Sequence, residues 1–318
     1  MKHHVNPSST NWVGRHSDSQ LYWHELVQLV NDLQIKKRQE PTIALLGYAV
    51  DAGVIRNGGR SGAKDGPDSI RKMLGPLANH LHETALVYDY GNIVVEDDNI
   101  DAAQLLMRDT IYTCLQENHL PVILGGGHDA AYPHFLGIQK HIETTGQTVG
   151  IINFDAHFDL RPLIDGKGHS GSPFLQIANQ FSNSFNYLVL GIQKASNPKT
   201  LFETASSFNC NFLEIEQFNI AHWDLVKKCI TNFIGSVDKV YVSIDLDGFS
   251  SAYAPGVSAP SPIGFTPEIV WKALEEIIQS NKLLSVDIVE LNPAYDKDNA
   301  TARLAARCVE YIVRTISR

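Results

Sequence analysis

Three potential metal ligands alternate within one short stretch of the sequence. Residues 153–161 read NFDAHFDLR, so Asp155, His157 and Asp159 occupy every second position. In extended backbone, alternate side chains point to the same side, and these three groups can therefore converge on one point. Carboxylates and imidazoles avoid burial unless they are paired or bind a metal, so the pattern predicts a metal site.

Similar groups follow other apolar runs of the chain. His128 comes after LPVILGGG, Asp245 and Asp247 come after VYVSI, and Glu290 comes after SVDIV. Ligands of open parallel sheets bind beyond the carboxyl ends of the strands, so we expect these side chains to gather at one edge. Carboxylates packed together would raise one another's pKa values unless cations lay between them. Two divalent ions would balance the four aspartates.

The donor set contains four carboxylates, two imidazoles and no thiolate. It suits Mn²⁺ better than a structural zinc ion, with cobalt, nickel, iron and zinc as alternatives. With two ions about 3.5 to 4 Å apart, a bridging water would lose a proton near neutral pH and become a hydroxide nucleophile. The pattern therefore predicts hydrolysis of an unreactive C–N bond.

The elements that must position these groups are apolar runs rich in Val, Ile, Leu and Tyr. They span residues 42–50, 85–95, 120–127, 148–157, 186–192, 237–247 and 282–292. Each is typical of a strand buried on both faces. Helical patterns occupy residues 101–118, 223–235, 266–280 and 299–317, and a leading helix is predicted over residues 21–35. This alternation predicts an α/β protein with a parallel sheet covered by helices.

Composition narrows the classes of function. The chain has 318 residues, of which 43% are hydrophobic, and no Pro/Ser-rich linker divides it. We predict one domain over residues 1–318, with residues 1–40 as a leading segment. A net charge of −9 argues against a nucleic-acid partner and favours a small molecule. No apolar run is long enough for a signal peptide or a membrane span, and the four cysteines form no C-x-x-C pair, so a cytoplasmic protein is expected.

Four segments in fixed order carry a resemblance to a known family. GGGHDAA, NFDAHFDLR, SIDLDGF and VDIVELNP together resemble the ureohydrolase family, which includes arginase, agmatinase and formimidoylglutamase. The resemblance runs from residue 43 to residue 310. It implies a three-layer α/β/α fold with a mainly parallel sheet of about eight strands. It also implies a dinuclear manganese centre, with two Mn²⁺ per subunit, and assembly as a homo-oligomer.

The resemblance also implies how the ligands are divided between the ions. One ion would be held by His128, Asp155, Asp159 and Asp245, and the other by Asp155, His157, Asp245 and Asp247. Asp155 and Asp245 would then bridge the two ions.

Departures from the common family pattern indicate the branch. Arginases and agmatinases usually read Gly-Gly-Asp-His at the first ligand, whereas this chain reads GGGHD, with the acid after His128. Ser170, in HSGSPF, stands where those enzymes place a histidine assigned to proton transfer. These features, and the segments FDLR, RNGGRSGAKDGP and APGVSAP, are similar to formimidoylglutamases. The implied reaction is manganese-dependent hydrolysis of N-formimidoyl-L-glutamate to L-glutamate and formamide, a step in histidine degradation.

Within that reaction, the resemblance gives roles to two carboxylates. Glu290 has the position that receives the cationic amidinium group, and Asp159 would pass a proton to the leaving nitrogen. Because the shuttle histidine is absent, His169 or bulk water would complete the transfer.

The two carboxylates of the substrate require cationic or hydroxyl partners. Arg161, Arg56 and Arg60 are candidates because guanidinium groups pair bidentately with carboxylates, and Ser170 is a further candidate contact.

Several alternatives stay open at this point. One is an amidinohydrolase that releases urea from a guanidino compound, such as an agmatinase, guanidinobutyrase or arginase. Others are a catalytically silent family member acting as a binding subunit, and an amide deacetylase with a single zinc. In purely structural terms, the six ligands could be caps and satisfied core histidines, Glu290 a paired strand-end carboxylate, Ser170 a turn former and Arg161 a loop brace.

Overall fold

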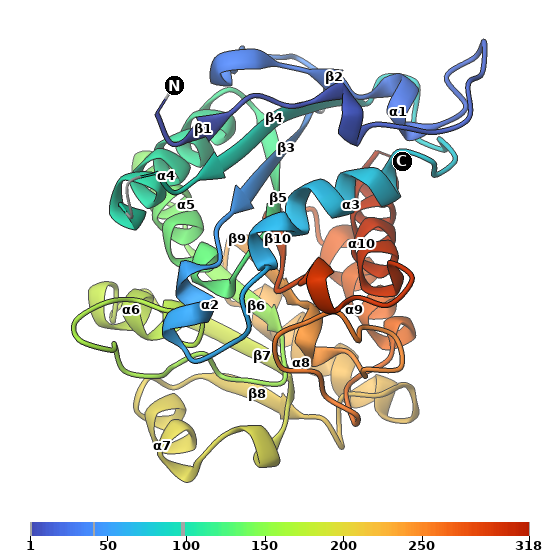
Figure 1. Cartoon of the computed structure of the whole chain (residues 1–318). Helices are drawn as coiled ribbons and strands as arrows, with labels where there is room; N and C mark the ends of the chain where they lie inside the picture. The colour runs from blue at the N-terminus through green and yellow to red at the C-terminus, as the bar shows by residue number, and fades with distance from the viewer. Residues whose placement is uncertain (1, 41, 97–98, 318) are drawn as a thin grey trace.

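A mixed sheet of ten strands forms the centre of the computed structural model, which describes residues 2–40, 42–96 and 99–317 (Figure 1). Its strand order is β1-β4-β3-β5-β10-β9-β6-β7-β8, and β2 pairs with β4. Eight strands are mutually parallel: β3 (Thr42–Ala49), β4 (Leu86–Val94), β5 (His119–Gly125), β6 (Val149–Phe154), β7 (Asn186–Ile192), β8 (Asn211–Glu214), β9 (Lys239–Asp245) and β10 (Leu283–Val289). The antiparallel β1 (His4–Val5) and the parallel β2 (Gln28–Leu29) extend the sheet along β4.

Helices cover both faces of this sheet. One face is covered by α3 (Gly66–Leu74), α8 (Trp223–Gly235), α9 (Pro267–Gln279) and α10 (Ala300–Ile316), and the other by α4 (Ile100–Gln116), α5 (Ala131–Thr145), α6 (Pro173–Gln180) and α7 (Lys199–Ser207) (Figure 1). Two short helices, α1 (Trp23–Leu26) and α2 (Ala52–Arg56), lie in the connections. Each face has its own buried apolar cluster. The predicted three-layer α/β/α fold is confirmed.

Strand β9 shows why these apolar runs form buried strands. Val240, Val242 and Ile244 belong to one core, whereas Tyr241 belongs to the other, as alternation of side chains across a sheet requires. Every residue from Val240 to Asp245 is buried. A strand buried on both faces needs apolar side chains on both, which explains the continuous apolar run. All seven predicted strands are present, and β8, β1 and β2 are additions.

The leading helix predicted over residues 21–35 is wrong. Only Trp23–Leu26 is α-helical and Asn31–Leu33 forms a short 3₁₀ turn, while the backbone N–H of Val30 donates to the carbonyl of Asp89 in β4. Asp32 and Leu33 have φ values of 56° and 52°, which an α-helix does not permit. The edge of the sheet offers unpaired backbone groups to this segment, and that pairing replaces the helical hydrogen bonds.

The length and polarity of the helices bear on whether the chain could span a membrane. Across the described ranges of the chain, every helix is too short or too polar to cross a bilayer.

Candidate metal centre

Four neighbouring strands carry the predicted ligands to one edge of the sheet. In the order β5-β10-β9-β6, these strands lie side by side and run parallel. His128 follows β5, Glu290 follows β10, Asp245 ends β9 and Asp155 follows β6. Residues far apart in the chain therefore meet because their strands are adjacent and end at the same edge.

The first group of ligand atoms surrounds the imidazole of His128. Its Nδ1 lies 2.9 Å from carboxylate oxygens of both Asp159 and Asp245, and 3.4 Å from one of Asp155. The four ligand atoms lie within 4.8 Å of one another, and all four residues are buried. This arrangement matches the ligand set that the family resemblance implies for one ion.

The second group contains Asp155, His157 and Asp247, whose ligand atoms also lie within 4.8 Å of one another. Nδ1 of His157 lies 3.3 Å from carboxylate oxygens of both aspartates. Asp155 belongs to both groups, as expected of a bridging ligand. Asp245 belongs to the first group only, so the structure does not bring it into the second set that the resemblance implies.

Local hydrogen bonds aim the aspartate side chains. Oδ1 of Asp155 accepts the backbone N–H of His157 at 2.7 Å, and Oδ1 of Asp245 accepts that of Asp247 at 2.8 Å. Asn153 Nδ2 donates to Oδ2 of Asp155 at 2.9 Å, which restrains the second oxygen as well. The i to i+2 spacing seen in the sequence thus forms turns that fix each carboxylate.

Two residues of the site have left-handed backbone. Asp159 has a φ of 49° and Glu290 a φ of 68°. Non-glycine residues are uncommon there, and such strain costs on the order of 1–3 kcal/mol per residue. Strain of this kind concentrates at functional sites, where the surrounding fold holds a side chain in a required direction.

Burial and mutual repulsion shape the electrostatics of the cluster. Burial and the neighbouring Asp247 raise the pKa of Asp245 well above its usual range, and burial with Asp247 raises the pKa of Glu290 to about 8. Burial also raises the pKa of Asp159, with Asp155 adding to the effect. These carboxylates repel one another in a desolvated place, and divalent cations between them would relieve that repulsion.

The residues present fit divalent cations. Among the described residues, Nδ1 of His128 and Oδ1 of Asp247 are buried polar atoms without a hydrogen-bond partner. Buried polar atoms are normally hydrogen-bonded, so an orphan in each group indicates a ligand atom that faces a cation. The donors are carboxylate oxygens and imidazole nitrogens, as manganese-type ions prefer.

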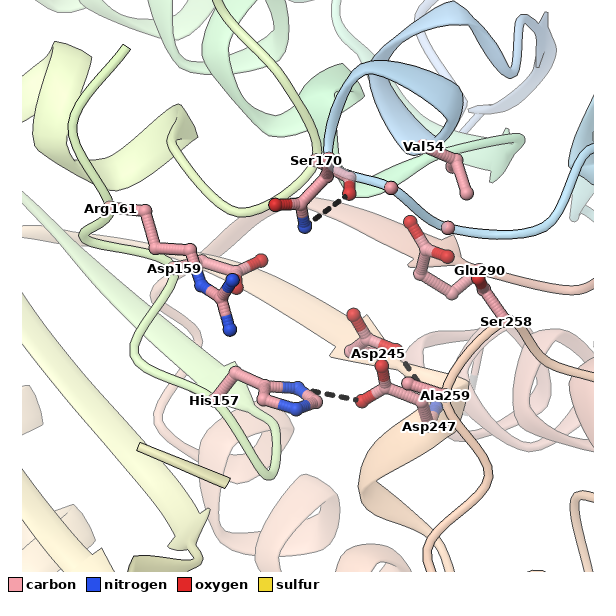
Figure 2. Close-up of a pocket in the computed structure, with 13 residues that line it drawn as sticks. Val54, His157, Asp159, Arg161, Ser170, Asp245, Asp247, Ser258, Ala259 and Glu290 are labelled. Atoms are coloured by element: carbon pink, nitrogen blue, oxygen red, sulfur yellow. Dashed lines mark hydrogen bonds and ion pairs between the residues drawn. The ribbon is translucent and has the colours of Figure 1, made fainter. Parts of the chain in front are cut away.

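A cavity of about 240 Å³ opens directly on this cluster (Figure 2). His157, Asp159, Asp245 and Asp247 form part of its lining. Its remaining lining residues come from α2, three loops and the end of β10: Val54, Asn57, Gly58, Gly59, Arg161, Ser170, Ser258, Ala259 and Glu290. A small molecule in this cavity would reach the metal ligands.

An acidic and a basic side chain line opposite sides of this cavity. Figure 2 shows Glu290 on one side and Arg161 on the other, with the aspartates and His157 between them. Oε1 of Glu290 accepts the backbone N–H of His128 at 2.8 Å, which fixes its carboxylate beside the metal cluster. Arg161 is an exposed side chain whose backbone N–H donates to the Gly171 carbonyl at 2.9 Å. The cavity can therefore receive a cationic group at one end and an anionic group at the other.

The other two predicted arginines fasten loops and do not line the cavity. Arg56 donates to the carbonyl of Gly168 at 3.2 Å. Arg60 donates to the carbonyls of Ser258, at 3.1 Å, and Val257, and it stacks on Tyr295 with its guanidinium 3.7 Å from the ring centre. The structure therefore does not bring Arg56 and Arg60 to the cavity, in contrast to the expectation that they bind substrate carboxylates.

His169 is also a structural residue in this fold. It is 1% exposed, its Nε2 lies 2.9 Å from the carbonyl of Pro162, and its Nδ1 accepts the backbone N–H of Gly171 at 3.1 Å. Both ring nitrogens are thus used by the backbone, and His169 is not part of the cavity lining. This corrects the expectation that His169 transfers a proton.

Ser170 does line the cavity, and it has a partner that was not expected. Its Oγ lies 3.1 Å from Nδ2 of Asn57, which donates to it. Asn57 lies just after α2, in the glycine-rich segment RNGGRSGAKDGP, but it was not singled out from the sequence within that segment. Its position before Gly58 and Gly59 is the only available signal, since glycines let a loop backbone approach a ligand closely.

Comparisons with known proteins show the family of the chain. The family model described as the arginase family matches residues 41–314. A curated formimidoylglutamase of Clostridium tetani is 36% identical, covering 96% of this chain and 94% of its own length. One of Vibrio parahaemolyticus is 40% identical, covering 93% and 91%.

Solved structures share the fold. The crystal structure of formimidoylglutamase from Bacillus subtilis aligns with a TM-score of 0.83 and 24% identity, covering 96% of this chain and 94% of that one. That of Trypanosoma cruzi formiminoglutamase with Mn²⁺ aligns with a TM-score of 0.78 and 24% identity, covering 90% and 97%. From its match to the family model and to its curated relatives, the chain belongs to the arginase family.

Proposed function

We propose that this protein hydrolyses N-formimidoyl-L-glutamate to L-glutamate and formamide with two Mn²⁺ ions. The observation that carries the proposal is the cavity that places Glu290 and Arg161 on opposite sides of a metal-ligand cluster. The proposed substrate has a cationic amidine at one end and two carboxylates at the other, so its charges complement the cavity. The curated relatives named formimidoylglutamase, which align with nearly the whole chain, support the same substrate.

We assign the ligands as the structure groups them. His128, Asp155, Asp159 and Asp245 would hold one ion, and Asp155, His157 and Asp247 the other. Manganese fits the oxygen and nitrogen donors, and it is the metal that the Trypanosoma cruzi structure contains. Two divalent ions held by these residues would lower the pKa of a bound water and so supply a hydroxide nucleophile near neutral pH.

Glu290 orients the reacting carbon. Its carboxylate can accept the N–H donors of the amidinium in charge-assisted hydrogen bonds. Because Oε1 is itself held by the backbone N–H of His128, the carboxylate cannot swing away from the metal ligands. The amidine carbon is thereby held facing the cluster, which supplies the proximity and orientation that hydrolysis requires.

Asp159 is placed to move the proton. It belongs to the metal cluster and also lines the cavity, so it can take a proton from the attacking water and pass it to the leaving nitrogen. His169 has no part in this transfer because its ring nitrogens contact the backbone. The final proton reaches the product by way of Asp159 and solvent.

Arg161 selects for a dianionic substrate. Its guanidinium reaches the cavity from the wall opposite Glu290, and it can pair bidentately with a carboxylate. Ser170 and Asn57 add polar atoms to the same cavity. A guanidino substrate with a free amine, such as agmatine, would place a second positive charge in this cavity with Arg161.

The substrate is tested with purified, manganese-loaded protein given formimidoylglutamate, arginine, agmatine and guanidinobutyrate, with formamide and urea both quantified. We expect formamide from formimidoylglutamate alone, and urea without formamide would overturn the proposal.

Loss of activity in Asp155→Ala, with folding retained, would exclude a silent subunit, and two metal ions per chain would exclude a single-zinc deacetylase. Assembly as a homo-oligomer and a cytoplasmic location stay predictions.

A further inference from the structure

A buried chain of hydrogen bonds lies behind His128, on the side of the ring away from the carboxylates. Nε2 of His128 lies 2.8 Å from Oγ of Ser243 in β9, and that hydroxyl donates to Oδ1 of Asp287 in β10 at 2.5 Å. His128, Ser243 and Asp287 are all 0% exposed. Neither Ser243 nor Asp287 lines the cavity, so neither can touch a substrate there.

Asp287 is held as an anion by the groups around it. Besides the hydroxyl of Ser243, its carboxylate accepts the hydroxyl of Tyr241 and lies 2.8 Å from Nδ1 of His134. Burial alone would raise the pKa of Asp287, but the hydrogen bond and charge of His134 lower it below its usual value. The hydroxyls of Ser243 and Tyr241 both donate to this carboxylate, and an ionised carboxylate can only accept hydrogen bonds.

The far end of the network fixes the direction of these bonds. Oγ of Ser285 donates to the carbonyl of Pro121 at 3.0 Å, so it can only accept from Nε2 of His134, 2.6 Å away. Nδ1 of His134 lies 2.8 Å from Oδ2 of the Asp287 carboxylate. His134 and Ser285 therefore form the far end of the network, away from His128.

The directions of these hydrogen bonds determine the tautomer of His128. Ser243 has a single hydroxyl proton and donates it to Asp287, so its Oγ can only accept from Nε2 of His128. A histidine that binds a metal ion through one ring nitrogen carries its proton on the other, and the contact with Ser243 assigns that proton to Nε2. Nδ1 keeps its lone pair, and Nδ1 is the atom that lies 2.9 Å from oxygens of Asp159 and Asp245.

We propose that Ser243 and Asp287 are positioning residues that hold His128 in the orientation and tautomer that binds a divalent metal ion through Nδ1. The inference rests on the proposed function, in which His128 is a metal ligand. Mutation of such a hydrogen-bond partner of a ligating histidine usually lowers metal affinity about 10- to 100-fold. His157 is in the other ligand group, so the effect should fall on one ion of the two.

The test is calorimetric titration of the purified, metal-free, full-length protein with Mn²⁺, using Ser243→Ala and the matched control Ser285→Ala. Both serines are 0% exposed, on neighbouring strands, and each has one hydroxyl that joins the network, but only Ser243 contacts His128. We expect Ser243→Ala to lower the affinity for one of the two Mn²⁺ ions about 10- to 100-fold. Ser285→Ala should leave both affinities within about threefold of the parent.

Further variants keep the test decisive if Ser243→Ala unfolds. Ser243→Thr retains the hydroxyl and should keep the parent affinity, whereas Asp287→Asn removes the charge and should weaken the same single ion. Circular dichroism and thermal unfolding of each metal-free variant show whether the fold is kept. Unchanged affinities in Ser243→Ala and Asp287→Asn, or an equal loss in Ser285→Ala, would overturn the positioning role. A parent protein that binds no Mn²⁺ would instead refute the proposed function.

Discussion

The backbone N–H of His128 donates a 2.8 Å hydrogen bond to Oε1 of Glu290, across 162 positions of the sequence. The bond joins the ends of β5 and β10, which are neighbouring strands. It fixes the residue that would orient the substrate relative to a residue that would hold the metal. Metal binding and substrate orientation would therefore be coupled through this hydrogen bond.

The first prediction concerns Glu290→Gln. The amide oxygen of glutamine can still accept the His128 N–H, so the local structure and Mn²⁺ binding should persist, but the charge that pairs with the amidinium is lost. A hydrogen bond to a charged group contributes about 1.5–3 kcal/mol, which corresponds to a fall in kcat/KM of roughly 10- to 100-fold. Steady-state kinetics and metal titration of the same preparation check this. Loss of both metal ions in the variant would contradict it.

The second prediction concerns Arg161→Gln. The variant removes the cation that faces Glu290 across the cavity, so KM for formimidoylglutamate should rise by roughly 10- to 100-fold, with a smaller change in kcat. Arg56→Gln is the matched control, because Arg56 donates to the Gly168 carbonyl and does not line the cavity. An equal rise in KM in both variants would show that Arg161 acts through loop structure.

The three arginines also show what sequence can and cannot determine. The apolar strand patterns and the polar residues that follow them predicted that four strands end at one edge of the sheet. Parallel strands share a direction, and ligand sites lie at their carboxyl ends. Arg56, Arg60 and Arg161 look equivalent as letters near a glycine-rich loop or a metal motif. Only the folded loops reveal which guanidiniums donate to backbone carbonyls and which one reaches the cavity.

The same limit applies to His169 and to the N-terminal segment. The burial of His169 depends on a turn that brings Pro162 and Gly171 onto its ring, and no local pattern encodes that contact. The apolar spacing of residues 21–35 is helical, but the edge of β4 competes for the same backbone groups. Both errors arise because distant partners decide where a local group makes its bonds.

The third prediction concerns removal of metal. A ligand that binds the folded state at a hundred times its Kd adds about 2.7 kcal/mol to the free energy of unfolding. Chelation with EDTA should therefore lower the melting temperature, and added Mn²⁺ should restore it. Asp155→Ala should respond much less to Mn²⁺, because Asp155 belongs to both ligand groups. Thermal unfolding followed by circular dichroism gives the melting temperatures of the parent and the variant, each with EDTA and with added Mn²⁺. An equal response of parent and variant to Mn²⁺ would refute the shared role of Asp155.

The fourth prediction separates a structural His169 from a proton-transferring one. His169→Ala leaves the Gly171 N–H and the Pro162 carbonyl without partners, which should lower stability by about 1–3 kcal/mol. The pH dependence of kcat in the folded variant should keep the shape it has in the parent. Melting temperature and a pH–rate profile check the two parts. A profile that loses one limb at unchanged stability would restore a catalytic role for His169.

The fifth prediction uses a glycine to move Arg161 without changing it. A Cβ at Gly171 would lie 3.0 Å from Cδ of Arg161 and 3.0 Å from Nδ2 of Asn57, so Gly171→Ala must displace one or both side chains. We expect KM for formimidoylglutamate to rise while both Mn²⁺ affinities stay at the parent values, because the three atoms nearest the new methyl group belong to Arg161 and Asn57 and not to a metal ligand.

Gly235→Ala is the matched control for this change, since a Cβ at Gly235 meets no atom within 4 Å. Its KM should equal that of the parent. If Gly171→Ala also leaves KM unchanged, the exact positions of the side chains that it displaces would not matter for substrate binding, and Arg161→Gln alone would then test the charge of Arg161. The two glycine variants together thus test geometry separately from charge.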